Sequence, residues 1–112
     1  MTDVLVVDVA NLLGSRPDGW WRDRAGATRR LLDRLAAAGL GEVVAVVEGR
    51  AAAVDDVAGL SVVRAPGSGD DEVVRQVLAR RGCTVVTADR GLLARLPEGT
   101  PVLGPGTLRE RL

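Results

Sequence analysis

Acidic side chains recur directly after the short apolar runs of this sequence, an arrangement that can hold a metal ion. Four runs are followed in this way, by Asp8, by Glu48, by the pair Asp70–Asp71 and by Asp89. Carboxylates within about 4–6 Å of one another repel, and a divalent cation among them relieves that repulsion. Oxygen ligands without histidine or cysteine select a hard cation, so we expect Mg²⁺ or Mn²⁺. Such an ion would stabilise phosphoryl oxygens and activate an attacking water.

Each of these carboxylates also has an ordinary structural explanation. Asp70–Asp71 lie where a capping box and the positive end of a helix both favour acidic residues. Asp89 suits the N-cap of a following helix, and Asp8 suits a hydrogen bond to the turn after it. Glu48 suits a solvated loop position or an ion pair with Arg50. The metal hypothesis therefore depends on the whole set rather than on any single member.

The composition narrows the chemistry further. The 112 residues include no histidine, no lysine and one cysteine, Cys83. This excludes a histidine-activated nucleophile, a thiolate zinc cluster and an internal disulfide, and it suits a reducing cytoplasm. The 15 arginines balance 15 acidic residues to a net charge of zero. Any binding of nucleic acid therefore depends on the local distribution of charge.

The apolar runs are too short for a membrane protein. None approaches the roughly 20 residues that a membrane-spanning helix needs. No basic segment precedes the first run, so we expect no signal peptide. These features predict a cytoplasmic protein without a membrane partner.

The elements that must position the carboxylates follow from the pattern of apolar residues. Short runs rich in β-branched residues predict buried parallel strands at Val4–Val7, Val43–Val47, Leu60–Val63, Thr84–Thr87 and Pro101–Leu103. Helices are predicted between and after them at Asp23–Ala38, Arg50–Ala58, Asp70–Arg81, Arg90–Leu96 and Thr107–Leu112. Alternating strands and helices predict one doubly wound α/β domain over residues 1–112. Ligands of such sheets bind at the carboxyl ends of the strands, where the acidic residues lie.

The stretch from Val9 to Arg22 departs from this alternation. It contains two glycines, a proline and the pair Trp20–Trp21, and its apolar residues show little helical or strand periodicity. A connection of this length exceeds the usual 2–6 residues of an α/β unit. We therefore predict a long irregular loop that serves in binding.

Four segments of the sequence resemble the NYN branch of the PIN-like nucleases. The first-strand Asp followed three residues later by Asn, the acidic pair that opens a central helix and the Thr-x-Asp motif after the fourth strand occur in the order of that family. The matching segments are Val6–Asn11, Ser68–Val74 and Val85–Gly91, and Gly14–Arg22 is similar to small NYN proteins of actinobacteria. The resemblance covers nearly the whole chain.

The resemblance implies a three-layer sandwich whose parallel five-stranded sheet has the order 3-2-1-4-5, with helices on both faces. It also implies a Mg²⁺- or Mn²⁺-dependent ribonuclease. Carried over by position, Asp8, Asp70 and Asp89 are the metal ligands, and Asp71 assists them directly or through water. Glu48 matches a position that is often acidic in relatives, which suggests a further metal ligand, although Asp is more usual there.

The resemblance also suggests residues that contact the RNA, whether single-stranded or structured. Asn11 would fix the Asp8 side chain or a phosphate, and Thr87 would orient Asp89 or a metal-bound water. Arg16 and Arg90 flank the acidic residues and suit phosphates, although each also suits a solvated surface. Trp20 suits stacking on a base or packing of the loop.

Two other functions remain open at this stage. A PIN-like regulatory module would bind metal or RNA without turnover, alone, as a homodimer or with a partner protein. A nucleotide phosphohydrolase would use the same metal chemistry. The chain lacks a Gly-x-x-x-x-Gly-Lys-Ser/Thr loop, and Asp8-Val9-Ala10 lacks the second Asp of a phosphoaspartyl motif.

Overall fold

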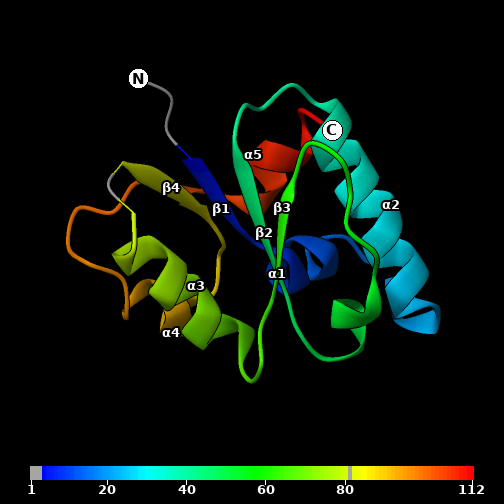
Figure 1. Cartoon of the computed structure of the whole chain (residues 1–112), viewed down its shortest axis with the longest axis horizontal. Coiled ribbons are helices and arrows are strands. Elements are labelled where there is room, and N and C mark those ends of the chain that lie inside the picture. The colour runs from blue at the N-terminus through cyan, green and yellow to red at the C-terminus, as the bar shows by residue number, and fades with distance from the viewer. Residues whose placement is uncertain (1–3, 81) are drawn as a thin grey trace.

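A five-stranded, all-parallel sheet forms the centre of the protein (Figure 1). The computed structural model describes residues 4–80 and 82–112, without the side chains of residues 50 and 52. The strands are β1 (Val4–Asp8), β2 (Val43–Val47), β3 (Ser61–Arg64), β4 (Cys83–Val86) and β5 (Val102–Leu103). Their order in the sheet is β3-β2-β1-β4-β5, which confirms the predicted topology.

Helices cover both faces of the sheet and make a three-layer sandwich. They are α1 (Val9–Gly14), α2 (Arg24–Ala37), α3 (Gly69–Leu78), α4 (Arg90–Leu93) and α5 (Pro105–Arg109), with short 3-10 helices η1 (Trp20–Arg22) and η2 (Gly49–Ala53). Helices α1, α2 and α5 lie on one side of the sheet, and α3 and α4 lie on the other (Figure 1). None of the helices in the described ranges is long and apolar enough to cross a membrane.

The central strands are buried on both faces because alternate side chains point into two separate cores. One core joins the strands to α1, α2 and α5, and its members include Val7, Ala45, Val86, Leu12, Leu32 and Leu108. The other joins them to α3 and α4, and its members include Val6, Val44, Val85, Val73, Val77 and Leu92. This double burial explains why the strands are continuous apolar runs rather than alternating ones.

The prediction of an irregular loop from Val9 to Arg22 was wrong over its first half. Helix α1 begins directly after β1, and the side chain of Asp8 caps it by accepting a hydrogen bond from the Asn11 N–H at 3.3 Å. Its buried residues Val9, Leu12 and Leu13 have helical spacing. Six residues are too few to show that period clearly, and the glycine and proline that follow obscured it.

Several predicted boundaries also moved. The expected helix over Arg50–Ala58 is only the 3-10 helix η2. The expected helix Asp70–Arg81 ends at Leu78, and Arg81 itself lies outside the described residues. The last helix begins earlier than expected, at Pro105, because proline suits the first helical turn, where its missing N–H has no intrahelical partner.

The burial of leucines in the helices predicts how their substitution changes the free energy of unfolding. Leu32→Ala is expected to lower the free energy of unfolding by about 2–5 kcal/mol, because its fully buried side chain leaves a cavity. Leu78→Ala is the matched control, and its 67% exposed side chain predicts a change below about 0.5 kcal/mol. Urea denaturation measures both. Equal losses in the two variants would contradict this assignment of core and surface.

Candidate functional site

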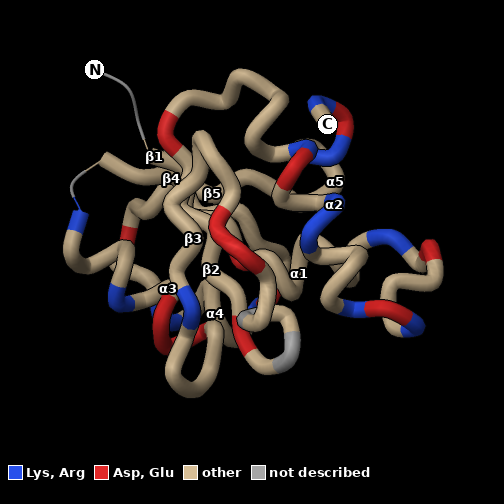
Figure 2. Tube along the Cα trace, turned by 45° about the vertical axis from the view of Figure 1, so that its right-hand side comes forward, with Lys and Arg blue, Asp and Glu red and all other residues tan. Residues whose placement is uncertain are grey.

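Four carboxylates from separate segments meet at the carboxyl-terminal edge of the sheet. Asp8 ends β1 and Glu48 follows β2, whereas Asp70 and Asp89 lie at the N-terminal ends of α3 and α4. These residues surround a cavity of about 230 Å³, which we call the acidic cavity. Its lining consists of Asp8, Ala10, Asn11, Glu48, Asp70 and Asp89. Figure 2 shows acidic segments at this end of the sheet, beside α3 and α4.

Asp8 is the most enclosed of the four carboxylates, with 6% of its surface exposed. Its Oδ1 accepts from the Asn11 N–H at 3.3 Å, and its Oδ2 accepts from the Thr87 hydroxyl at 3.0 Å. Each oxygen therefore has one satisfied acceptor position and keeps a second lone pair. The sequence suggested the first of these bonds as a turn contact, and the fold adds the second.

Thr87 connects the two central strand ends. Its hydroxyl donates to Asp8 and also accepts from the Asp89 N–H at 3.1 Å. Beside it, Asn11 Oδ1 accepts from the Ala88 N–H at 2.8 Å. The segment from Thr87 to Asp89 is thus fixed to the start of α1 by two side chains. The side chain of Asn11 therefore holds this loop, and the backbone N–H of Asn11 holds the Asp8 carboxylate.

Asp89 and Glu48 each combine a capping bond with a place in the cavity wall. Asp89 Oδ1 accepts from the Leu92 N–H at 3.0 Å and caps α4. Glu48 Oε2 accepts from the Gly69 N–H at 2.7 Å, at the start of α3. A Cβ on Gly69 would lie 2.9 Å from the Glu48 carboxylate, so glycine permits this approach. The alternative pairing of Glu48 with Arg50 lies outside the described side chains.

The surroundings of the cavity raise the pKa of two of its carboxyl groups, those of Asp8 and Asp70. Burial raises the pKa of Asp8, opposed by the hydrogen bonds from Asn11 and Thr87, and the charges of Asp70 and Glu48 raise it further. Burial also raises the pKa of Asp70, together with the charges of Asp89 and Glu48, against the lowering effect of Arg95. The carboxylates therefore act on one another across the cavity, as the sequence-based repulsion argument requires.

The donor set fits a hard divalent cation by its chemistry. All four charged side chains of the cavity offer carboxylate oxygens, the ligands that Mg²⁺ and Mn²⁺ prefer. Over the described residues, however, no three acidic side chains stand close enough to share one ion. Three of the four, Asp8, Glu48 and Asp89, use an oxygen in a backbone capping bond. Shared ligation therefore requires the side chains to rotate toward the centre.

Asp71 and Arg90, two further residues suggested by the sequence, are not in the cavity wall. Asp71 forms an ion pair with Arg95 at 2.7 Å and lines a separate depression with Glu72. Arg90 is exposed in the first turn of α4. Glu72 lies in the Ser68–Val74 segment, but the sequence assigned it no role. It is 4% exposed, and Arg75 and Gln76 of the same helix donate hydrogen bonds to it.

Arg16 and Trp20 belong to a different part of the molecule. Trp20 lines a second cavity, between α2 and α5, and Arg16 is close enough to Arg109 of that cavity to affect its pKa. Trp20 is half-buried, stacks edge-to-face on Trp21 at 5.8 Å and lies 5.4 Å below the Arg24 guanidinium. Trp21 is 55% exposed. Arg16, which was expected to flank the acidic residues, thus lies near the second cavity, and Trp20 lines that cavity.

Comparison with known proteins supports the fold. No protein-family model matches the sequence, and a search of curated proteins gave no significant match. The structure is similar to the crystal structure of a mutant of Rae1 (YacP) from Bacillus subtilis, with a TM-score of 0.72. The match covers 98% of this chain and 75% of that chain, at 17% sequence identity. At this identity the likeness shows a shared fold, and the PIN-like parallel sheet predicted from the sequence is therefore confirmed.

Proposed function

We propose that this protein is a divalent-metal-dependent ribonuclease of the NYN type, acting at the acidic cavity. One observation carries the proposal: four carboxylates from four segments converge there, and none of them forms an ion pair with a described side chain. A divalent cation would balance this negative charge, which no ion pair offsets at the ligand-binding edge of the sheet. RNA as the substrate follows from the family resemblance of the Asp8, Asp70 and Asp89 segments.

The residues of the cavity have distinct roles in this proposal. A bound Mg²⁺ or Mn²⁺ would lower the pKa of water and stabilise the phosphoryl oxygens when a P–O ester bond breaks. Asp8, Asp70 and Asp89 would hold it, with Glu48 as a further ligand. Thr87 fixes Asp8 directly and Asp89 through its backbone, so it would set the distance between these two ligands. The ion pair with Arg95 directs Asp71 away from the cavity, so we assign it an indirect, electrostatic role.

A regulatory module that binds metal or RNA without turnover is the second candidate. It is favoured by the capping bonds of Asp8, Glu48 and Asp89, because these bonds give each carboxylate a structural role that needs no catalysis. The two candidates share the metal and differ in hydrolysis.

An assay of single-stranded RNA cleavage in the presence of Mn²⁺ distinguishes the ribonuclease from the module that binds without turnover. Asp70→Asn and Asp89→Asn are each expected to lower kcat by about 100-fold or more, because each removes charge from the centre that stabilises the transition state. Asp55→Asn is the matched control, since the Asp55 side chain is 90% exposed and lies outside the cavity. If Asp70→Asn and Asp89→Asn both cleave RNA at the rate of the wild type, the proposed nuclease site is ruled out.

Metal binding should also raise the melting temperature of the protein, which can be measured without any assay of cleavage. At a Mn²⁺ concentration ten times Kd, the folded state gains about 1.4 kcal/mol. In a domain of this size that gain raises Tm by about 5 °C. Asp89→Asn is expected to abolish the rise. A rise of equal size in wild type and Asp89→Asn would show that the ion binds elsewhere.

The metal-free protein should respond to pH through Asp70. The raised pKa means that the charged Asp70 carboxylate destabilises the folded state, so Asp70→Asn should raise the metal-free Tm at pH 7. The gain should shrink as pH falls and vanish below the ordinary aspartate pKa of about 4, where both states hold the proton. Asp71→Asn should instead lower Tm at pH 7, because it breaks the ion pair with Arg95. Scanning fluorimetry across this pH range measures both, and a lower Tm for Asp70→Asn would contradict the repulsion.

A further inference from the structure

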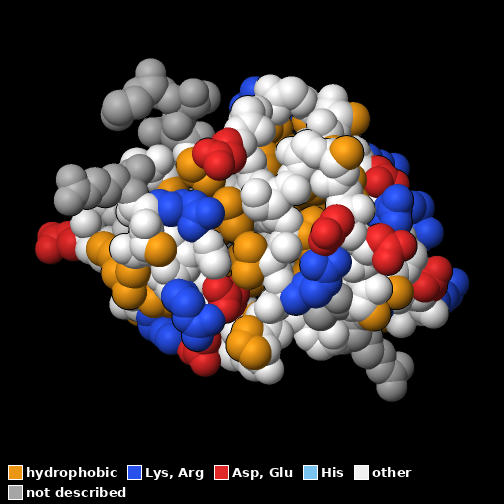
Figure 3. Space-filling model, in the orientation of Figure 1, with side chains coloured by type: hydrophobic (Ala, Val, Ile, Leu, Met, Phe, Trp, Pro, Cys, Tyr) orange, Lys and Arg blue, Asp and Glu red, His pale blue; other side chains and the backbone are white. Residues whose placement is uncertain are grey.

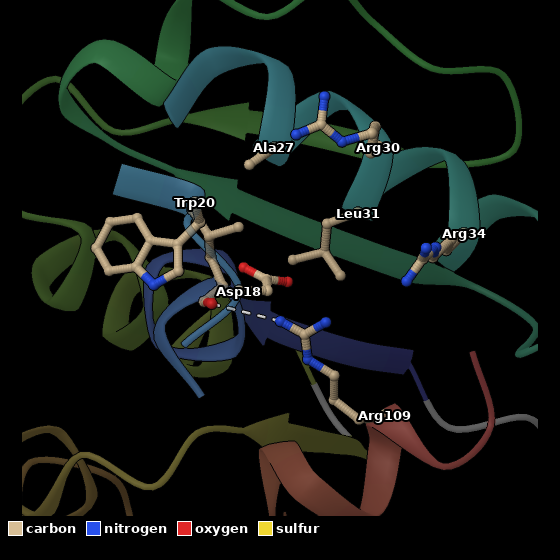
Figure 4. Close-up of a pocket in the computed structure, with 8 residues that line it drawn as sticks. Asp18, Trp20, Ala27, Arg30, Leu31, Arg34 and Arg109 are labelled. Carbon is tan, nitrogen blue, oxygen red and sulfur yellow. Dashed lines mark hydrogen bonds between the residues drawn. The ribbon is translucent and has the colours of Figure 1, made fainter. Parts of the chain in front are cut away.

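A second cavity, of about 160 Å³, is lined by arginines and by Trp20. We call it the arginine cavity, and its polar lining is Arg30 and Arg34 of α2, Arg109 of α5 and Asp18. Figure 4 shows Arg109 reaching from α5 toward Asp18 and Trp20, with Arg30 and Arg34 on the helix above. Figure 2 shows that basic segments are frequent along α2 and around α5.

The positive charge of this cavity is not balanced by the protein. Across residues 4–80 and 82–112, none of Arg30, Arg34 and Arg109 forms an ion pair within 4.0 Å. Asp18 is the one acidic residue of the lining. The pKa of Arg109 is lowered, first by burial and then by the charges of Arg16 and Arg34, against the raising effect of Asp18. An anion in the cavity would relieve this repulsion.

Arg109 is held in place while keeping donors free. Its Nη2 donates to the carbonyls of Leu12 and Leu13 at 2.9 and 3.3 Å, and its Nε donates to Ser15 Oγ at 3.3 Å. Its Nη1 donates to no residue in the described part of the chain. A guanidinium fixed in this way presents two N–H groups in a defined direction, which suits a phosphate oxygen.

The size of the cavity selects the kind of anion. Pockets for whole small molecules usually occupy about 300–1,000 Å³. At about 160 Å³ the arginine cavity is smaller, so it suits a single phosphate group better than an entire nucleotide. Trp20 also lines the cavity and is only partly buried, so a base next to the bound phosphate would lie near its ring.

A depression along α1 adjoins the acidic cavity and extends toward Arg109. It is lined by Ala10 and Asn11, which also line the acidic cavity, and by Ser15, which accepts the hydrogen bond from Arg109. The six residues of α1 span about 9 Å, so a short stretch of one strand can reach from one cavity to the other. On the face seen in Figure 3, charges of both signs are interspersed with small hydrophobic groups.

We propose that the arginine cavity is a phosphate subsite for the RNA strand whose scissile bond lies in the acidic cavity. This inference rests on the proposed function and adds a direction to it, because the strand would run along α1 from Asn11 to Arg109. It gives a role to three arginines that the fold gathers in a chain of zero net charge. Phosphate contacts of this kind position a strand without reading its sequence.

The test removes two cavity charges and measures salt dependence. Binding of a single-stranded RNA of about 12 nucleotides, within the usual site sizes, is followed by fluorescence anisotropy in EDTA, so that no cleavage occurs. The double variant Arg30→Gln/Arg34→Gln should reduce the slope of log K against log salt by about 1.4, and weaken binding about 20-fold at 0.1 M salt. In Mn²⁺ it should raise KM more than it lowers kcat.

The matched control is Arg29→Gln/Arg80→Gln, which removes the same charge outside the cavity. Arg29 is on α2 but pairs with Asp33, and Arg80 follows α3 on the other layer. Because Asp33 balances the charge of Arg29, and Arg80 follows the helix on the opposite face of the sheet from α2, this pair should change affinity less than threefold. Equal effects of the two double variants, or no RNA binding by the wild type, would overturn the subsite.

Two further outcomes separate the subsite from the proposed function. RNA binding that is lost only in Arg30→Gln/Arg34→Gln, with no cleavage by the wild type, would support the subsite and contradict the nuclease. Cleavage by the wild type, together with an unchanged slope of log K against log salt in Arg30→Gln/Arg34→Gln, would support the nuclease and contradict the subsite. Inorganic phosphate, followed through Trp20 fluorescence in a Trp21→Phe background, should bind more weakly than RNA. Equal affinity would identify a site for a free anion and overturn the role in guiding a strand.

Discussion

The buried hydrogen bond between the Thr87 hydroxyl and the Asp8 carboxylate is the contact on which the site depends. It is 3.0 Å long, and the residues are 1% and 6% exposed. A buried carboxylate is costly unless its oxygens are satisfied. Here the Asn11 N–H satisfies one oxygen locally, and the Thr87 hydroxyl satisfies the other and joins the ends of β1 and β4. Because Thr87 in turn orders the backbone at Asp89, one hydroxyl fixes the relative positions of two carboxylates that are 81 residues apart in sequence.

Three of the four carboxylates of the acidic cavity also bond the backbone at the start of a helix. Asp8 caps α1, Asp89 caps α4, and Glu48 caps the start of α3 from across the sheet. Each cap occupies one acceptor position, so the remaining lone pairs stay available to a ligand. The doubly wound topology places the N-terminal ends of these helices at the edge where the strands end, and the helix dipoles stabilise negative charge there. The fold can therefore hold together a group of charges that would repel one another in solution.

The sequence predicted the strands well because their β-branched runs are buried on both faces, and the strand ends in turn located Asp8, Glu48 and Asp89. It failed where local signals are weak. Helix α1 is too short to show a period, and the bond between Glu48 and Gly69 joins residues 21 positions apart. Arg16 was expected beside the acidic residues, but the turn after α1 carries it toward Arg109 of α5. Distances that depend on the path of a loop are not encoded in any local pattern.

The central claim is that the carboxylates of the acidic cavity share a divalent cation, and the most direct measurement is a crystal structure grown with Mn²⁺ and examined by anomalous scattering. The account predicts a peak within the cavity, with oxygens of Asp8, Asp70 and Asp89 at the roughly 2.0–2.2 Å typical of small divalent ions. It also predicts that the Thr87 hydroxyl stays bonded to Asp8. An empty cavity at saturating Mn²⁺, or a peak held only by residues outside it, would contradict the account.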